Sequence, residues 1–304
     1  MSRPAASPLA QVSDFDLRLL RVFRAVAEAG SFAGAESALG ITRSAISLHM
    51  ADLEQRLGMR LCQRGRAGFA LTDQGREVLR SAESLLAAVE DFRTGVNQLH
   101  QSLRGDLNIG VMNNLVTLPR MRITAALQAI RQRGDAVRIH LSMSPPAEIE
   151  RGVLDGRLHA GAVPLITPLS GLAYLPLYDE ASQLYCSRAH PLFARAAEVE
   201  APALREAAAV VPTYRMTAEA LGLHQGLNCV ASASDREAIA FLILTGQFIG
   251  FLPDHYAEAW VARGQMAALA PERMRFSVPL ALATRKGRRQ NLLVEEFIAA
   301  LMRT

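Results

Sequence analysis

The amino-acid sequence predicts an α/β fold with three parts: an N-terminal winged helix-turn-helix over 1–72, a linker helix over 73–104, and a two-lobed doubly wound domain over 105–304. Three observations lead to this prediction. Short helical patterns separated by glycines fill the first part, one apolar stripe at heptad spacing runs through the second, and strand and helix patterns alternate through the third. A chain of 304 residues is long enough for two domains and a third small one.

The composition is that of a globular protein. Half of the residues are hydrophobic and 20% are charged, which excludes disordered, collagenous and repeat proteins. No run of about 18 apolar residues appears, so we expect no transmembrane helix, and the first residues lack the apolar stretch of a secretory signal. The three cysteines are too few and too scattered for a disulfide framework, so the sequence predicts a reduced, cytoplasmic protein.

Positive charge is concentrated at the N-terminal end. The net charge is +4, and residues 1–72, with nine arginines and six acidic residues, account for +3 of it. Such an excess is compatible with a nucleic-acid partner without demonstrating one.

Three short helices and a hairpin are expected in the first part. Each helix begins after a capping side chain and ends at a glycine: the pairs are Asp14 or Asp16 with Gly30, Ser31 with Gly40, and Thr42 with Gly58. The first helix carries apolar residues at helical spacing, namely Leu17, Leu20, Phe23, Val26 and Ala27. Two strands over 60–63 and 69–71 follow, joined by a turn over 64–68.

The third helix has an apolar face and a second face of mostly small side chains, which are Arg43, Ser44, Ser47, Leu48 and Ala51. A helix fits the major groove of DNA, where short hydroxyl side chains and arginines reach base edges and phosphates. The hairpin carries Arg64 and Arg66, which suit a wing on the DNA backbone or minor groove. The alternative is a small helical domain whose polar face is merely solvated, and the pattern alone leaves both interpretations open.

The second part is a helix with a narrow apolar seam. Its members are spaced alternately four and three residues apart: Val78, Ala82, Leu85, Val89, Phe92, Val96 and Leu99. A lone helix cannot bury such a stripe, so the spacing predicts a dimerisation helix. The alternative is a helix packed on the core of its own chain.

The third part alternates between strands and helices. Strands over 107–111, 137–143 and 158–163, with helices over 115–133 and 146–156 between them, give a β-α-β-α-β order and a mostly parallel sheet. Further strands are expected over 172–178, 183–187, 208–211, 229–231, 248–252 and 278–283. A capping box at Ser234–Glu237 marks the start of one more helix, and a last helix is expected over 291–302. We expect lobe I at about 105–176 and 277–304, lobe II at about 177–276, and a cleft between them.

Residues 14–75 closely resemble the LysR-type transcriptional regulator family. The matching residues are Phe23, Ala27, Gly30, Ser31, Phe32, Ala35, Ala38, Leu39, Ser44, Ala45, Ile46, Ser47, Leu53, Glu54, Leu57, Gly58, Leu61, Arg64, Leu71, Thr72 and Gly75. The order of the three parts also matches. The resemblance implies a bacterial regulator with a winged helix-turn-helix, a dimerising linker helix and an effector domain similar to periplasmic solute-binding proteins. It implies promoter DNA, a small-molecule effector and RNA polymerase as partners, and a homotetramer built from two dimers.

The resemblance places DNA contacts on Thr42, Arg43, Ser44, Ser47 and Leu48, and a phosphate contact on Arg64. The sequence departs from the family where Arg43 replaces a common glutamine, Ser44 a common proline and Cys62 a usual phenylalanine. Arg43 could pair with the O6 and N7 atoms of guanine.

The resemblance also places the effector cleft at the ends of strands in both lobes. The residues concerned are Asn113, Asn114 and Ser144 in the first lobe and Pro212, Thr213, Tyr214, Ser232 and Ser234 in the second. Ligands of doubly wound sheets sit at such ends, where helix N-termini offer free N–H groups. Asn114 and Ser144 could equally serve as helix caps alone, and Pro145, Pro146 and His159 depart from the family pattern. We expect a small anionic or polar-aromatic effector.

Catalytic motifs are missing from the sequence, which has no glycine-rich phosphate loop, zinc-protease motif or nucleophile elbow. We therefore expect no enzyme, no cofactor and no metal. Cys186 with His190 could be half a metal site but has no evident partners, and Cys186 with Cys229 could form a redox switch. The two function classes left are a ligand-responsive transcription factor and a cytosolic small-molecule-binding protein without gene control. The first 75 residues favour the former, because a pure binder does not need a winged helix-turn-helix.

Overall fold

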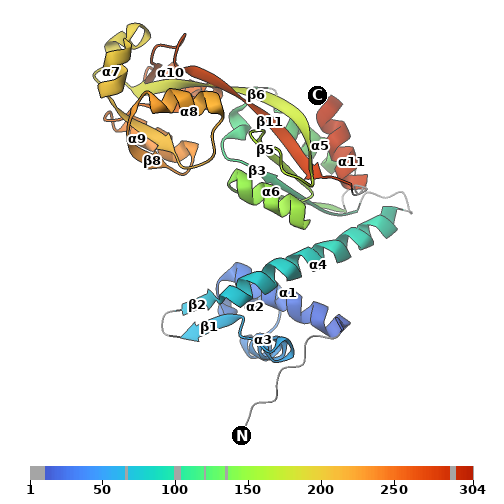
Figure 1. The fold of residues 1–304 in the computed structure, drawn as a ribbon. Coiled ribbons are helices and arrows are strands. Elements are labelled where there is room, and N and C mark those ends of the chain that lie inside the picture. The colour runs from blue at the N-terminus through green and yellow to red at the C-terminus, as the bar shows by residue number, and fades with distance from the viewer. Residues whose placement is uncertain are drawn as a thin grey trace. The chain divides into compact units, whose positions relative to one another are not determined.

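The computed structural model describes residues 11–65, 68–98, 104–119, 121–133, 136–287 and 292–303 (Figure 1). The chain divides into a compact N-terminal unit, which extends to Val96, and a second compact unit that holds nearly all of the remaining residues. Within the described ranges, no helix is both long and apolar enough to cross a membrane.

The N-terminal unit begins with three helices and a hairpin. They are α1 (Asp14–Ala29), α2 (Phe32–Leu39), α3 (Arg43–Leu57), β1 (Cys62–Gly65) and β2 (Gly68–Leu71). Gly30, Gly40 and Gly58 end the helices with φ of 61°, 64° and 66°, the left-handed conformation that glycine adopts without strain. Ser31 and Thr42 cap α2 and α3, as the sequence predicts.

The cap of α1 is Ser13 rather than Asp14 or Asp16. The Ser13 hydroxyl accepts from the N–H of Asp16, and the Asp16 carboxylate accepts from the N–H of Ser13. Asp16 therefore stands at the third helical position, where a carboxylate closes a capping box. It is buried, and Arg56 of α3 donates to both of its oxygens at 2.5 and 2.9 Å. These bonds to Arg56 lower the pKa of Asp16 from 3.8 to about 2.

We expect Asp16→Asn to lower the free energy of unfolding of the N-terminal unit by about 2 kcal/mol at neutral pH, because it removes this ion pair. Since the folded pKa is depressed, the contribution of Asp16 is complete above about pH 4 and is lost as the pH falls toward 2. Urea denaturation followed by circular dichroism across this range measures both effects. Asp14→Asn, at an exposed site in the same helical turn, is the control, and an equal loss in both variants would contradict the account.

The core of the N-terminal unit lies between α1, α2 and α3. The buried hydrophobic residues are Leu19, Val22, Phe23, Val26, Ala35, Ile46, Met50, Leu53, Leu61 and Cys62. Leu17 and Leu20, which belong to the same apolar stripe of α1, are only half-buried. The buried carboxylate of Glu54 accepts from the N–H of Leu61 at 2.8 Å and of Cys62 at 3.3 Å, and thereby fixes the start of the hairpin to α3.

The predicted apolar seam of the linker helix α4 (Asp73–Gln98) has two halves that differ in burial. Val78 packs against the core of the N-terminal unit, and Ala82 is buried. Farther along, Val89 is half-buried, whereas Leu85, Phe92 and Val96 are 36%, 74% and 42% exposed. Leu99 lies outside the described residues. Among the residues that the structure covers, the C-terminal half of the seam therefore has no full apolar cover.

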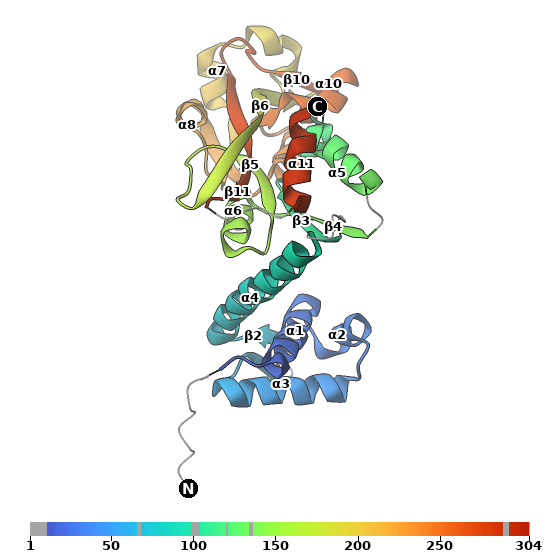
Figure 2. The same ribbon diagram turned by 90° about the vertical axis from the view of Figure 1, so that its right-hand side faces the viewer.

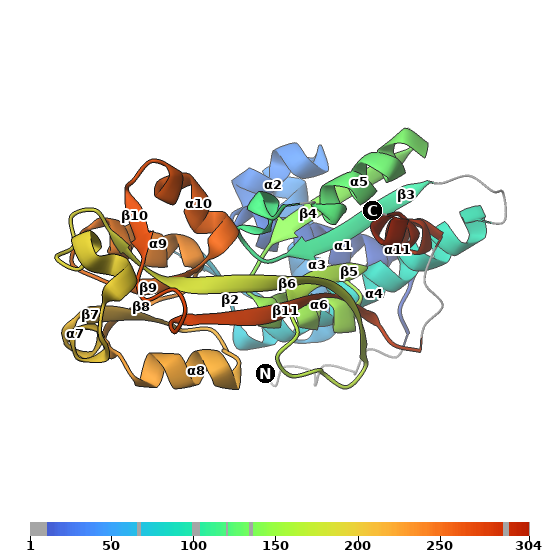
Figure 3. The same ribbon diagram turned by 90° about the horizontal axis from the view of Figure 1, so that it is seen from above.

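The second unit is built on a seven-stranded sheet with the order β10-β6-β11-β5-β3-β4, in which β9 also pairs with β6. Its strands are β3 (Gly105–Val111), β4 (Val137–Met143), β5 (Ala160–Pro164), β6 (Leu172–Ser187), β9 (Gly250–Pro253), β10 (Met266–Ala268) and β11 (Arg275–Arg285). Strand β3 is parallel to β4 and β5. The long strands β6 and β11 run antiparallel beside each other from one lobe to the other (Figure 3).

In each lobe, helices pack around a separate hydrophobic core. In lobe I the helices are α5 (Arg122–Arg133), α6 (Pro146–Asp155) and α11 (Leu292–Arg303), and α5 lies beside α11 (Figure 2). Lobe II has the parallel pair β7 (Ala208–Pro212) and β8 (Asn228–Ala233), with helices α7 (Ala201–Glu206), α8 (Ala218–Gln225), α9 (Arg236–Leu244) and α10 (Asp254–Ala262). Two short 3-10 helices are η1 (Leu115–Thr117) and η2 (Phe193–Glu198).

Three predicted elements differ in extent from the structure. The strands expected over 172–178 and 183–187 form the single strand β6; Glu180 and Ser182 interrupt its apolar pattern although both are buried. The helix expected over 115–133 is split into η1 and α5, because Pro119 disfavours a helical conformation for Leu118, whose φ and ψ are −61° and 133°.

The helix caps also differ from the expected ones in three places. Asp235, rather than Ser234, caps α9 and accepts from the N–H of Ala238 at 2.9 Å, while the Ser234 hydroxyl donates to Asp235. Helix α6 begins at Pro146, so Ser144 stands before the capping position. Asn114 precedes η1 without any cap bond from its side chain.

The structure gives a physical reason for His159, which departs from the family pattern. Its Nδ1 accepts from the N–H of Asn108 at 2.9 Å, and its own N–H donates to the Asn108 carbonyl at 2.8 Å. The imidazole thus satisfies a backbone donor of β3 at the start of β5.

Candidate functional site

The first candidate surface is the exposed face of α3. Thr42, Arg43, Ser44 and Leu48 are exposed on it, Leu48 by 62%, and Ser47 is half-buried. The Thr42 hydroxyl accepts from the N–H of Ala45 at 3.3 Å, so the helix start is held by its own cap. The opposite face of α3 carries the buried residues Ile46, Met50 and Leu53.

The hairpin follows α3 directly. The backbone of Arg64 pairs with that of Phe69 in the β1–β2 ladder, and Arg66 lies outside the described residues. The N-terminal unit thus presents a helix with one exposed face followed by a two-stranded wing. This arrangement suits insertion of the helix into the major groove.

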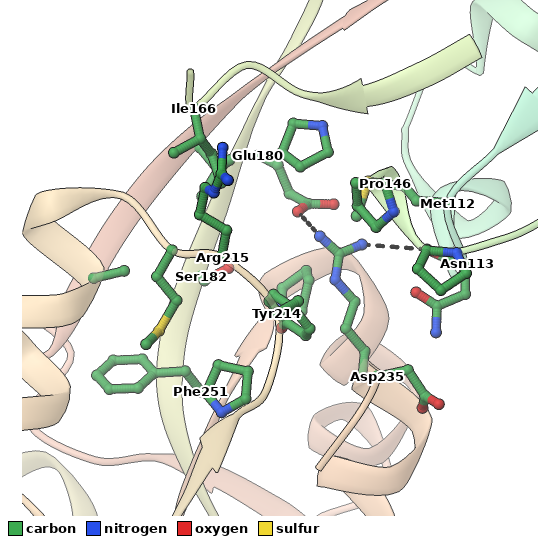
Figure 4. A pocket seen from close by; sticks show the side chains of 18 of the residues that line it. Met112, Asn113, Pro146, Ile166, Glu180, Ser182, Tyr214, Arg215, Asp235 and Phe251 are labelled. Carbon is green, nitrogen blue, oxygen red and sulfur yellow. Dashed lines mark hydrogen bonds and ion pairs between the residues drawn. The ribbon is translucent and has the colours of Figure 1, made fainter. Parts of the chain in front are cut away.

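The second candidate site is a cavity of about 290 Å³ between the two lobes of the second unit (Figure 4). Lobe I contributes the segment after β3 and the turn between β4 and α6. Lobe II contributes the segment between β7 and α8 and the start of α9, and the crossing strands β6 and β11 form part of the wall. The hydrophobic lining includes Met112, Met143, Ile166, Phe251, Phe276 and Val278.

The structure places five of the eight predicted effector residues in this wall: Asn113, Ser144, Pro212, Tyr214 and Ser234. Asn114, Thr213 and Ser232 do not line it. Thr213 and Ser232 are exposed. Asn114, with φ of 64°, turns the chain at the end of β3.

A buried polar network joins the two lobes beside the cavity. Glu180 of β6, whose side chain is fully buried, forms an ion pair with Arg236 and a 3.0 Å contact with the His255 Nε2. The Nδ1 of His255 lies 2.7 Å from the Thr117 hydroxyl, and Arg236 also donates to the carbonyl of Asn113 at 3.3 Å. Thr117 and Asn113 belong to lobe I, whereas α9 and α10 carry Arg236 and His255 in lobe II.

Four charged side chains line the wall. Glu180 and Arg236 form an ion pair, whereas Asp235 caps α9 and has no cationic partner among the described residues. Arg215 is exposed and forms no ion pair or hydrogen bond within the described part of the chain; like Ile166, it lines the cavity (Figure 4). Burial raises the pKa of Tyr214, and Arg236 opposes that rise. The cavity thus combines apolar walls with one available cation.

Sequence reasoning missed Glu180, Ser182, Arg215 and Arg236. Glu180 and Ser182 are polar residues two apart within an otherwise strand-like stretch, so they share one face, but the sequence does not show that this face is buried. Arg236 directly follows a capping aspartate and therefore lies at the start of a helix. Their convergence depends on long-range pairing, which the sequence alone does not give.

Cys186 and His190, which the sequence offers as half of a metal site, are both buried. Cys186 is buried in the core of lobe II, and burial raises the pKa of its thiol to about 11. Burial also lowers the pKa of His190, whose Nδ1 accepts from the N–H of Leu192 at 3.2 Å. The described residues contain no group of three or more side chains placed to hold a metal ion.

Comparisons with known proteins match both units. Residues 17–76 match the model described as bacterial regulatory helix-turn-helix protein, lysR family, and residues 100–304 match the LysR substrate binding domain. The chain is 62% identical over 302 residues to the HTH-type transcriptional activator BauR of Pseudomonas aeruginosa, covering 99% of each chain. It is 29% identical over 261 residues to the SDS degradation transcriptional activation protein of a Pseudomonas species, covering 84% and 79%.

Solved structures share the fold. The crystal structure of full-length CbnR complexed with its target DNA matches with a TM-score of 0.65 at 22% identity, covering 94% of this chain and 99% of that chain. The structure of a full-length OxyR variant from Pseudomonas aeruginosa matches with a TM-score of 0.61 at 16% identity, covering 96% and 95%.

Proposed function

Because the chain belongs to the LysR family of transcriptional regulators, we propose that it binds promoter DNA through α3 and its wing and activates transcription in response to a cavity ligand. The proposed DNA contacts are Thr42, Arg43, Ser44, Ser47, Leu48, Arg64 and Arg66. The observation that carries the proposal is the exposed face of α3, within the segment that matches the family's helix-turn-helix model. Activation is inferred from the name of the 62% identical relative.

The ligand site of the proposal is the cavity between the lobes, with Asn113, Ser144, Pro212, Tyr214 and Ser234 among its contacts. Ligand binding there would change the angle between the lobes, since lining residues come from both. The network around Glu180 crosses the same boundary and would be rearranged by such a change. In this proposal the protein binds its ligand without transforming it, as its membership of a family of transcriptional regulators suggests.

The proposed assembly is a homotetramer made of two dimers. Within each dimer, the two subunits are joined through the exposed half of the α4 seam. It acts in the cytoplasm, where promoter DNA and RNA polymerase are found. The apolar side chains left without full cover on α4 support the dimer.

Arg43→Ala should weaken binding to the DNA upstream of the protein's own gene by about 1–3 kcal/mol, because an arginine at the start of the exposed face can reach a guanine edge. Binding to random DNA should weaken less. Fluorescence anisotropy titrations of both duplexes at one salt concentration measure the difference.

The matched control is Arg205→Ala, an exposed arginine of α7 in the second unit, which removes the same charge. It should leave both affinities unchanged. Equal losses on the two duplexes for Arg43→Ala would make Arg43 a phosphate contact. Absence of any preference of the wild-type protein for its upstream DNA would favour a small-molecule binder without gene control.

A further inference from the structure

One side chain in the cavity wall is buried with an unused acceptor. His224, on α8, is only 4% exposed and lines the cavity. Its Nδ1 lies 2.8 Å from the carbonyl oxygen of Ala220, one turn earlier in the same helix. Its Nε2 is buried and has no hydrogen-bond partner among the residues that the structure describes.

The surroundings of His224 determine which proton it carries. A carbonyl oxygen only accepts, so Nδ1 must hold the hydrogen, and Nε2 of the neutral ring is then a pure acceptor. Burial lowers the pKa of His224, which keeps the ring neutral. The ring also packs against Phe251, with centroids 4.9 Å apart, so both its orientation and its tautomer are fixed.

A buried acceptor without a donor is unfavourable, and a phenylalanine or leucine would fill the same apolar surroundings without that cost. We therefore propose that the ligand of the cavity carries an O–H or N–H donor that the Nε2 of His224 accepts. This proposal rests on the proposed function, in which the cavity is the effector site.

The position of His224 also indicates the shape of the ligand. Thr217, Ala220 and His224 lie on one face of α8 and all line the cavity. Two helical turns, about 10 Å along the axis, separate Thr217 from His224. Arg215, the cation without a described partner, stands two residues before Thr217 in the chain, whereas Phe251 packs against His224 at the other end. The ligand is therefore a small organic anion with an apolar body, whose charged group lies toward Arg215 and whose donor reaches His224.

The test uses the full-length protein and matched carboxylates, measured by calorimetric titration. Hexanoate is compared with 6-hydroxyhexanoate and 6-aminohexanoate, and 3-phenylpropanoate with 3-(4-hydroxyphenyl)propanoate. At least one donor-bearing member should bind about tenfold tighter than its parent or better, because the parent leaves the acceptor unpaired. The hydroxyl and amino members distinguish O–H from N–H donors.

Two variants locate this preference. His224→Phe should abolish it, whereas Gln225→Ala, the exposed neighbour on α8, should keep it. The proposal is overturned if each parent binds as tightly as its donor-bearing partners, if the preference survives in His224→Phe, or if no compound binds at millimolar concentration. The wild-type comparison decides the matter even where His224→Phe fails to fold.

DNA binding by the same preparation separates this inference from the proposed function. One outcome is that the protein prefers its upstream DNA and that a cavity ligand without a donor alters this binding. That result would overturn only the inference about His224 and would leave the proposed function intact. If the upstream DNA is not preferred over random DNA, the proposed function falls, whatever the carboxylates do.

Discussion

Arg236→Ala should lower the free energy of unfolding of the second unit by about 3–5 kcal/mol, because it leaves the carboxylate of Glu180 buried without its ion-pair partner. The side chain of Glu180 has no exposed surface, and among the described residues His255, at 3.0 Å from the carboxylate, would be its one remaining charge partner. The bond from Arg236 to the carbonyl of Asn113 would be lost as well. This is the largest effect that we expect from a single substitution.

The single tryptophan of the chain, Trp260, reports on this loss, because it packs with the core of lobe II and against Tyr256. Urea denaturation followed by its fluorescence gives the stability of that unit. The double variant Arg236→Ala with Glu180→Gln is the control, since removal of the unpaired charge should recover part of the loss. Additive losses in the double variant, or a loss below about 1 kcal/mol in the single one, would contradict the role of the pair.

Phe92→Asp should dissociate the dimer. Phe92 is 74% exposed on the described chain, between Val89 and Val96 on the same seam of α4. In a dimer joined through this seam each helix would bury a carboxylate, and an unpaired buried carboxylate costs several kcal/mol. Sedimentation equilibrium of the wild-type and variant proteins measures the change in oligomeric state.

The control for this variant is Arg80→Asp, which introduces the same side chain on the outer face of α4 and disturbs only a surface pair with Glu77. It should leave the oligomer intact. An unchanged oligomer in Phe92→Asp would mean that another surface joins the subunits.

The helices and strands that local signals mark could be predicted from the sequence. Glycines in the left-handed conformation end α1, α2 and α3, and alternating apolar residues mark β3 and β4. Helices α7, α8 and α10 were missed. Helix α8 was missed because it is short and its buried residues are only Ala220 and His224, so its sequence shows no apolar stripe.

Some residues of the candidate site could likewise be predicted from the sequence, and others could not. Residues next to strand ends, such as Asn113 and Tyr214, could be found because connections after parallel strands converge at one edge of a sheet. Glu180 and Ser182 could not be found, because a polar residue in a strand gives no sign of being buried until its partners are known. Arg236 and His255 reach Glu180 across 56 and 75 residues of sequence, and no local pattern encodes such pairing.

Occupation of the cavity between the lobes should alter how the protein binds promoter DNA. The most direct measurement titrates full-length protein onto an upstream duplex carrying a dye at each end, with and without a ligand that raises the melting temperature of the protein. The account predicts that the ligand changes either the Kd or the distance between the duplex ends, and that DNA changes ligand affinity by the same factor wherever the Kd changes. A ligand that binds the cavity and leaves both the Kd and the end-to-end distance unchanged would contradict it.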